Sequence, residues 1–257
     1  MLVLDKKEPY SVLGVDISPY SRDEFYELIE SRLKDNDPVT PPVFVITVNP
    51  EIVIQSIIDN EFKHILTSSS INTADGVGIS WAIEFLYNKH VDRITGSDSL
   101  ENICALCGKH HESAFLYGAM PTVAEKAATI LQSRIESFNI SGTYSPEKPD
   151  IPLEELPDDK REQLQNASVV FVALGAPAQE KWINENLPKL PNCKLIIGIG
   201  GTFDFIAGNV KRAPKWLQKS GLEWFYRLCN QPQRWRRMLK LPLFALNVLI
   251  LKVSNKY

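Results

Sequence analysis

The sequence predicts an α/β fold, in which helices flank a mainly parallel β-sheet. Five short segments are rich in β-branched residues and almost continuously apolar, which is typical of strands covered on both faces. They are residues 43–48, 64–69, 114–117, 169–174 and 194–199. Segments with helical periodicity lie between them, and this alternation indicates βαβ units. We therefore expect a Rossmann-like sheet, with a helical appendage at the C-terminus.

The predicted helices have recognisable ends. They cover residues 21–34, 50–59, 77–87, 97–107, 121–136 and 178–186. Ser21 is followed three residues later by Glu24, which is the spacing of a capping box. Pro50 and Pro121 stand at first helical positions, where the N–H that proline lacks would have no partner. Residues 143–157 contain four prolines and are predicted to form a loop, at a crossover or at the rim of the sheet.

The composition excludes several classes of protein. The chain has 257 residues, of which 44% are hydrophobic and 23% charged, so it is not disordered, collagen-like or coiled-coil as a whole. Its four cysteines are too sparse for a disulfide scaffold. Cys104 and Cys107 form a C-x-x-C in a helical pattern, but no second pair of cysteines or histidines completes a zinc set. We expect two buried thiols, no metal, and a reduced cytosolic setting.

Charge is distributed unevenly along the chain. The net charge is −3, yet residues 211–240 contain nine lysines and arginines and a single acidic residue, Glu223. We therefore predict a core domain, 1–210, and a basic, amphipathic appendage, 211–257. The apolar run at 241–251 is shorter than the roughly 18 residues of a spanning helix. A solvated face, a nucleic-acid site and a membrane-surface site for a lipid diphosphate all fit the basic run, and the adjoining apolar run favours the membrane over nucleic acid.

Polar residues stand where predicted strands end or helices begin. In doubly wound sheets, ligands bind just beyond the carboxyl ends of the strands. Asn49 precedes a helix that starts at Pro50, so it caps that helix or, together with Thr47, offers donors to a sugar or phosphate. Asp75 lies at a loop-to-helix junction, where it is either another N-cap or a general base.

Two further turns contain glycines. Residues 175–180, which include Gln179, resemble a phosphate-cradling turn but match neither a P-loop nor G-x-G-x-x-G. In residues 198–204, three glycines including Gly201 offer N–H groups to an anion, and Asp204 offers a carboxylate to a ribose or base. Each turn alone is explained by packing. The four loops together suggest a nucleotide or sugar-nucleotide site.

An ordered series of motifs extends from about Thr47 to Arg237: TVNPEIV, TADGVGI, RITGSDSL, FLYGAMP, GAPAQEKW, GIGGTFDFIAG, KRAPKW and GLEWFYRLCNQPQRWRR. In this series the chain resembles the WecG/TagA/CpsF glycosyltransferases, glycosyltransferase family 26. The resemblance implies an inverting, metal-independent transferase that needs no cofactor. Its best-known members move N-acetylmannosamine, or its uronic acid, from a UDP-sugar to N-acetylglucosaminyl-diphospho-undecaprenol, in the biosynthesis of teichoic acid or other surface polysaccharides.

The resemblance also assigns roles to individual residues. Asp75 matches the catalytic base, and Thr47 and Asn49 match residues that line the donor and acceptor pocket. The remaining matches are polar pocket residues, a nucleotide contact and diphosphate-binding arginines of the appendage. The polar pocket residues are Arg93 and Gln179, the nucleotide contact is Asp204 beside Gly201, and the diphosphate-binding arginines are Arg227, Arg234 and Arg237.

The expected reaction follows from these roles. Asp75 deprotonates the acceptor hydroxyl, which attacks the anomeric carbon, and the appendage arginines neutralise the departing UDP. The expected partners are a UDP-sugar, a polyprenyl-diphosphate-linked acceptor and the inner face of the plasma membrane, with no nucleic acid; a homo-oligomer is left open. The alternatives are a non-catalytic nucleotide-sugar-binding or membrane scaffold protein, and a nicotinamide dehydrogenase. The dehydrogenase is disfavoured because no G-x-G-x-x-G follows the first strand.

Overall fold

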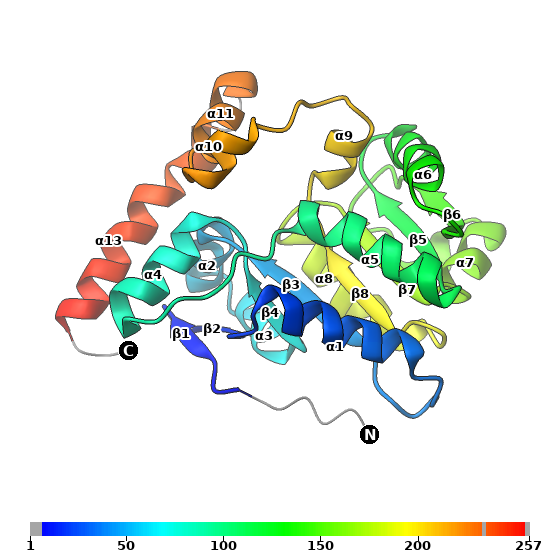
Figure 1. Ribbon diagram of the computed structural model, residues 1–257, viewed down its shortest axis with the longest axis horizontal. Helices are drawn as coiled ribbons and strands as arrows, with labels where there is room; N and C mark the ends of the chain where they lie inside the picture. Colours follow the sequence, from blue (N-terminus) through cyan, green and yellow to red (C-terminus); the bar gives the residue numbers. More distant parts are fainter. Residues whose placement is uncertain (1–6, 233–234, 255–257) are drawn as a thin grey trace.

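A six-stranded, all-parallel sheet forms the centre of the protein (Figure 1). The computed structural model describes residues 7–232 and 235–254. The strand order is β4-β3-β8-β7-β5-β6. The strands are β3 (Val43–Val48), β4 (Ile71–Ala74), β5 (Ser113–Gly118), β6 (Asn139–Tyr144), β7 (Val169–Ala173) and β8 (Leu195–Gly198). The predicted Rossmann-like architecture is therefore confirmed.

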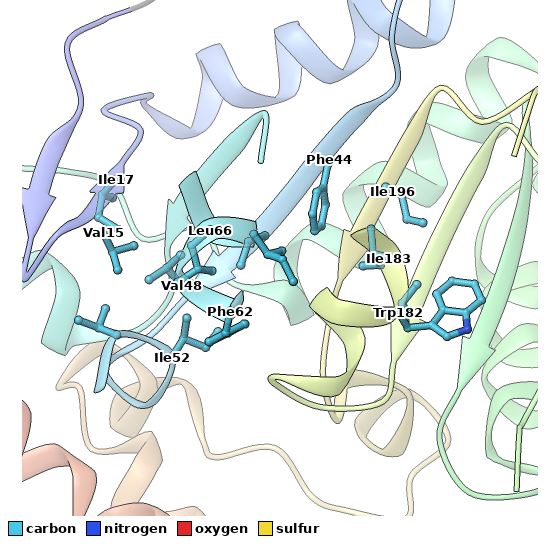
Figure 2. Packing of buried hydrophobic residues seen from close by; sticks show 14 of the residues in the cluster. Val15, Ile17, Phe44, Val48, Ile52, Phe62, Leu66, Trp182, Ile183 and Ile196 are labelled. Carbon is cyan, nitrogen blue, oxygen red and sulfur yellow. The ribbon is translucent and has the colours of Figure 1, made fainter. Parts of the chain in front are cut away.

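Helices cover both faces of the sheet, as the strands that are apolar on both sides require. One face carries α1 (Arg22–Lys34), α5 (Gly96–His110), α6 (Val123–Arg134) and α9 (Thr202–Ile206). The other carries α2 (Pro50–Ile58), α3 (Asn60–Ser68), α4 (Val77–Tyr87), α7 (Asp158–Gln165) and α8 (Ala178–Asn186). Each layer of helices packs on the sheet through a buried apolar cluster. Figure 2 shows residues of the cluster on the face that carries α2, α3, α4, α7 and α8.

Strand β3 shows how the alternation of side chains divides the two clusters. Phe44, Ile46 and Val48 face the cluster of Figure 2, whereas Val43 and Val45 belong to the opposite one. A small antiparallel hairpin, β1 (Tyr10–Val12) and β2 (Val15–Ile17), adds Val15 and Ile17 to the cluster of Figure 2.

The predicted strand at residues 64–69 is wrong, because residues 64–68 lie in α3 and Ser69 is the C-cap of that helix. Asp59 accepts a hydrogen bond from the backbone N–H of Phe62 and caps this helix, and Phe62, Ile65 and Leu66 are buried at helical spacing. The true strand is β4, whose polar composition concealed it. Its Asn72 is buried because Nδ2 donates to the carbonyls of Asp16 (3.0 Å) and Leu66 (2.8 Å).

Local signals were more reliable at some helix ends than at others. The capping box of α1 is present, with the Ser21 N–H donating to Glu24 Oε2 (2.9 Å). Pro121 is not a first helical residue, since α6 begins at Val123 with Thr122 as its N-cap. Strand β6 and helix α7 were not predicted. The expected loop at 143–157 contains the end of β6 and a short 3₁₀ turn, η1 (Leu153–Glu155).

The described residues of the C-terminal segment include the helices α10 (Lys215–Lys219), α11 (Glu223–Asn230), α12 (Trp235–Met238) and α13 (Lys240–Val253). Helix α13 packs on α2 and α4, and its Phe244 and Val248 are buried in the cluster of Figure 2. In Figure 1, helices α10–α13 form an arm beside the sheet, and α10 and α11 stand at its far end. The division at residue 210 stays a prediction, although α13 contributes to the core. Within the described residues, no helix has the length and hydropathy needed to cross a bilayer.

Candidate active site

A cavity of about 630 Å³ lies at the carboxyl end of the sheet, between the core and the C-terminal helices. The loops after β3, β4, β7 and β8 line it, and residues of α11, α12 and α13 complete the wall. From β3 the chain continues to β4, at one edge of the sheet. It then crosses back to form β5 on the other side of β3, next to β7. Loops diverge at such a change of direction and leave room for a ligand. All four loops that the sequence singled out therefore meet at one cavity.

Asp75 follows β4 directly and lines the cavity. Its backbone N–H donates to the carbonyl of Val48 (2.7 Å), which ties it to the end of β3. The N-cap of α4 is Gly76, at φ +87°, with no side-chain cap hydrogen bond, so the Asp75 carboxylate is not a cap. Burial raises the pKa of Asp75 from 3.8 to about 7. The carboxylate thus exchanges its proton near neutral pH, as a general base must.

The raised pKa of Asp75 predicts that the free energy of unfolding depends on pH. The folded pKa of about 7 lies above the unfolded value of 3.8, so the folded state holds the proton of Asp75 more tightly than the unfolded state does. The resulting contribution to the free energy of unfolding is fully present below pH 4 and is lost as the pH rises through 7. We expect Asp75→Asn, which stays neutral, to raise the free energy of unfolding by about 2 kcal/mol at pH 8 and to change it little at pH 4. Urea unfolding at the two pH values measures this. A gain of equal size at pH 4 would contradict the burial of an ionisable carboxyl.

Thr47 and Asn49 line the same cavity and also hold the structure together. The buried hydroxyl of Thr47 donates to the carbonyl of Gly198 (3.1 Å), which joins β3 to β8. Asn49 Oδ1 accepts from the N–H groups of Glu51 (3.0 Å) and Ile52 (3.1 Å), so Asn49 caps α2. Capping and lining the cavity are therefore not alternatives for Asn49, because the same residue does both.

Gln179 connects two of the cavity loops. It is buried, and its Oε1 accepts from the N–H groups of Gly175 (3.2 Å) and Gly200 (3.1 Å). Its Nε2 donates to Glu180 Oε1 (2.8 Å). A side chain at Gly198 would meet Nε2 at 2.6 Å, so this glycine makes room for the bridge. The N–H groups of Gly175 and Gly200 are thus occupied within the protein.

The other predicted site residues lie at different places. Gly201 lines the cavity as the N-cap of α9. Asp204 is on the first turn of α9 but is not among the residues that line the cavity. Arg93 lines the cavity and donates from Nη1 to the carbonyl of Gln218 (3.2 Å), so it holds the C-terminal segment to the core. Arg234 lies outside the described residues.

Two of the predicted arginines reach the cavity from the C-terminal helices. Arg227 on α11 places its guanidinium 4.5 Å from the centroid of the Phe205 ring, a cation–π contact with α9. Its Nε is buried and has no hydrogen-bond partner among the described residues. Arg237 on α12 is half exposed, with Nε 3.5 Å from Glu51 Oε1. Asp75 and cationic side chains therefore face one cavity.

Comparison with known proteins decides the family. The model of the glycosyl transferase WecG/TagA/CpsF family matches residues 10–257. The chain belongs to the WecG/TagA/CpsF family of glycosyltransferases. It is 38% identical over 203 residues to the N-acetylglucosaminyldiphosphoundecaprenol N-acetyl-beta-D-mannosaminyltransferase of Bacillus subtilis (strain 168), covering 79% of this chain and 77% of the relative. A protein of the same name from Staphylococcus aureus (strain MRSA252) is 30% identical over 237 residues, 92% and 91% of the two chains.

Membership of the WecG/TagA/CpsF family makes this chain a glycosyltransferase. Charged residues that the sequence did not assign to the site lie at the cavity or next to its lining residues. Arg212 and Glu223 line the cavity, and Asp98 pairs with Arg212. Glu180 is buried beside Gln179, where burial raises its pKa to about 7 and Oε2 has no hydrogen-bond partner among the described residues. Arg212 and Glu180 occur within the KRAPKW and GAPAQEKW motifs, so the motifs of the family already contained both residues.

The predicted cysteine chemistry can be compared with the structure directly. Cys104 and Cys107 are free and buried in α5. Burial raises the pKa of Cys107 to about 12, so its thiol stays protonated and inert at neutral pH. The expectation of two buried thiols is confirmed. Across residues 7–232 and 235–254, no group of three or more histidine, cysteine or acidic side chains is arranged to hold a metal ion.

Proposed function

We propose that the protein transfers N-acetylmannosamine from UDP-N-acetylmannosamine to a polyprenyl-diphosphate-linked N-acetylglucosamine, with inversion at the anomeric carbon. The observation that carries the proposal is the cavity itself, which is lined by Asp75, with a pKa of about 7, and by the cationic side chains of Arg227 and Arg237. A base and a cationic site are what transfer from a nucleoside diphosphate requires. The names of the relatives supply the sugar and the acceptor.

Asp75 acts as the base in the proposed reaction. Its carboxylate takes the proton of the acceptor hydroxyl, and the oxygen forms a bond to the anomeric carbon from the face opposite UDP. The bond between that carbon and the UDP oxygen breaks, and its electron pair leaves with UDP. A pKa of about 7 keeps a large fraction of Asp75 ionised at neutral pH while the carboxylate remains basic enough to take the proton.

Arg227 and Arg237 stabilise the charge that develops on the departing diphosphate. The guanidinium of Arg227 is fixed against Phe205, and its Nε offers a buried donor that no described residue accepts. A preorganised donor in a partly desolvated site is effective because no reorganisation is needed when charge develops. Arg234 is proposed to act with them on the basis of its motif alone.

The test measures UDP release with a synthetic polyprenyl-diphosphate-linked N-acetylglucosamine acceptor. We expect release with UDP-N-acetylmannosamine, far less with UDP-N-acetylglucosamine, and a product identified by mass as the acceptor plus one N-acetylhexosamine. A non-catalytic scaffold would release no UDP with any donor, and this result would contradict the proposal.

The same assay tests the role of metal ions. We expect an excess of EDTA to leave the rate unchanged within about twofold, because arginines supply the positive charge that a metal ion supplies elsewhere. The measurement is the initial rate before and after chelation. Loss of activity with EDTA and its recovery with Mg²⁺ would show that the arginines do not suffice.

We further propose that α11–α13 bind the cytoplasmic face of the plasma membrane, where the lipid-linked acceptor lies. The exposed face of these helices carries large apolar side chains next to basic ones, as interfacial helices do. These include Phe225, Trp235, Leu239, Leu243, Leu246 and Ile250. A homo-oligomer through part of this surface stays a prediction.

Binding to phospholipid vesicles tests whether α11–α13 contact the membrane. We expect sedimentation with anionic phospholipid vesicles and a decrease of at least fivefold for Leu246→Glu with Ile250→Glu, two exposed positions. The control is Ile58→Glu, an exposed apolar position at the end of α2. Equal binding by both variants would assign the membrane contact to another surface.

A further inference from the structure

Arg212 connects the core to α11 through two carboxylates. Its Nη1 lies 2.8 Å from Asp98 Oδ1, in the first turn of α5, and its Nε lies 3.8 Å from Glu223 Oε1, at the start of α11. The side chains of Arg212 and Glu223 are each only 28% exposed. Arg212 thus lies between an element of the core and the helix that carries Arg227.

The connection matters because the helices on which α11 packs most closely, α10 and α12, belong to the C-terminal segment itself. Helix α13 is fixed by burial of Phe244 and Val248, whereas α10 and α11 stand at the end of the C-terminal segment (Figure 1). Arg93 of the core holds α10 through the carbonyl of Gln218. Gly221 lies against Val77, and Arg227 stacks on Phe205. A charged contact that joins two elements therefore has a large share in deciding where Arg227 lies.

The geometry at Arg212 suits a guanidinium in particular. Two different nitrogens, Nη1 and Nε, address two different carboxylates, which a lysine ammonium at the end of a flexible stem does not reproduce. The Nε is buried and has no hydrogen-bond partner in the described part of the chain, and Glu223 is close enough to accept from it after a small shift. We propose that Arg212 is a positioning residue that fixes α11, and with it Arg227, against the first turn of α5 beside Asp75.

This proposal rests on the proposed role of Asp75 as the base, and the charges around Asp75 make it measurable. Asp75 is faced by Asp98 of α5, by Glu223 and Arg227 of α11, and by Arg212. The arginines lower the pKa of Asp75, and Glu223 and Asp98 raise it. Among the residues that the structure describes, the other charged side chains that line the cavity are Glu51, Arg93, Arg237 and Lys240.

The kinetic test compares Arg212→Gln with Lys211→Gln, a neighbouring exposed residue with the same change of charge. We expect Arg212→Gln to lower kcat/KM about tenfold and to move the rise of kcat/KM with pH to higher pH, because a positive charge near Asp75 is lost. Glu223→Gln moves that rise to lower pH, Arg212→Lys is intermediate, and Lys211→Gln resembles the unaltered protein. If Arg212→Gln and Lys211→Gln had the same pH profile and rate, the proposal would be overturned.

A second measurement does not depend on catalysis. Cys229 on α11 is exposed, whereas Cys104, Cys107 and Cys193 are buried, so a nitroxide reagent labels Cys229 selectively. We expect Arg212→Gln to increase the mobility of the nitroxide in the electron paramagnetic resonance spectrum, and Lys211→Gln to leave it unchanged. An unchanged spectrum in Arg212→Gln overturns the positioning role. If Asp75→Asn kept full activity, the base assignment would fail, and this spectrum would still decide the role of Arg212.

Discussion

Replacement of Asp75 by asparagine is expected to lower kcat by about 10²- to 10⁴-fold, the range for loss of a general base. Asparagine has nearly the same size but does not take up a proton, so the cavity keeps its shape. The Asp75 side chain makes no capping hydrogen bond to α4, so little local structure is lost. Initial rates of UDP release at pH 8, where Asp75 is mainly ionised, measure the effect.

Binding of UDP separates catalysis from recognition in this experiment. Because the base acts on the acceptor, we expect Asp75→Asn to bind UDP within about threefold of the unaltered protein by calorimetry. Asp16→Asn, an exposed position on β2, provides a control with the same chemical change. Undiminished kcat in Asp75→Asn would transfer the role of base to another group of the cavity.

Arg227→Ala is expected to lower kcat/KM by about 10²- to 10³-fold, the range for loss of one preorganised donor to a developing negative charge. Arg227 also lowers the pKa of Asp75, so its loss makes the base harder to ionise near pH 7. Both effects slow the reaction at neutral pH. Rates measured from pH 6 to 9 separate them, because only the second effect disappears at high pH.

Two further variants define what Arg227 contributes. Arg227→Lys keeps the charge but stacks less well on Phe205, so we expect partial activity. Arg134→Ala removes an exposed arginine at the end of α6, paired with Glu101, and serves as the control. These point variants are sharper than truncation at residue 210, which would also remove Phe244 and Val248 from the core. Equal loss in Arg134→Ala and Arg227→Ala would exclude a specific role.

The sequence predicted the elements whose signals are local. Strands β3, β7 and β8 were found because each is a short run of apolar, β-branched residues. The capping box of α1 and the Asn49 cap were found because each involves residues at most three apart. Strand β4 was missed because Asn72 and Thr73 look polar in the sequence. Their side chains find partners only after folding, as when Thr73 Oγ1 donates to the carbonyl of Ile94 (2.9 Å).

The sequence by itself determined the α/β architecture, the strand-end motifs and, through their order, the family. The tertiary structure alone decided that Asp75 and Arg227 meet at one cavity, that Gln179 bridges two loops, and that Arg212 lies between Asp98 and Glu223. It also decided that Asp75 has a pKa near 7. Local patterns depend on neighbours along the chain, whereas desolvation and Coulomb interactions depend on distances between residues that only the fold brings together.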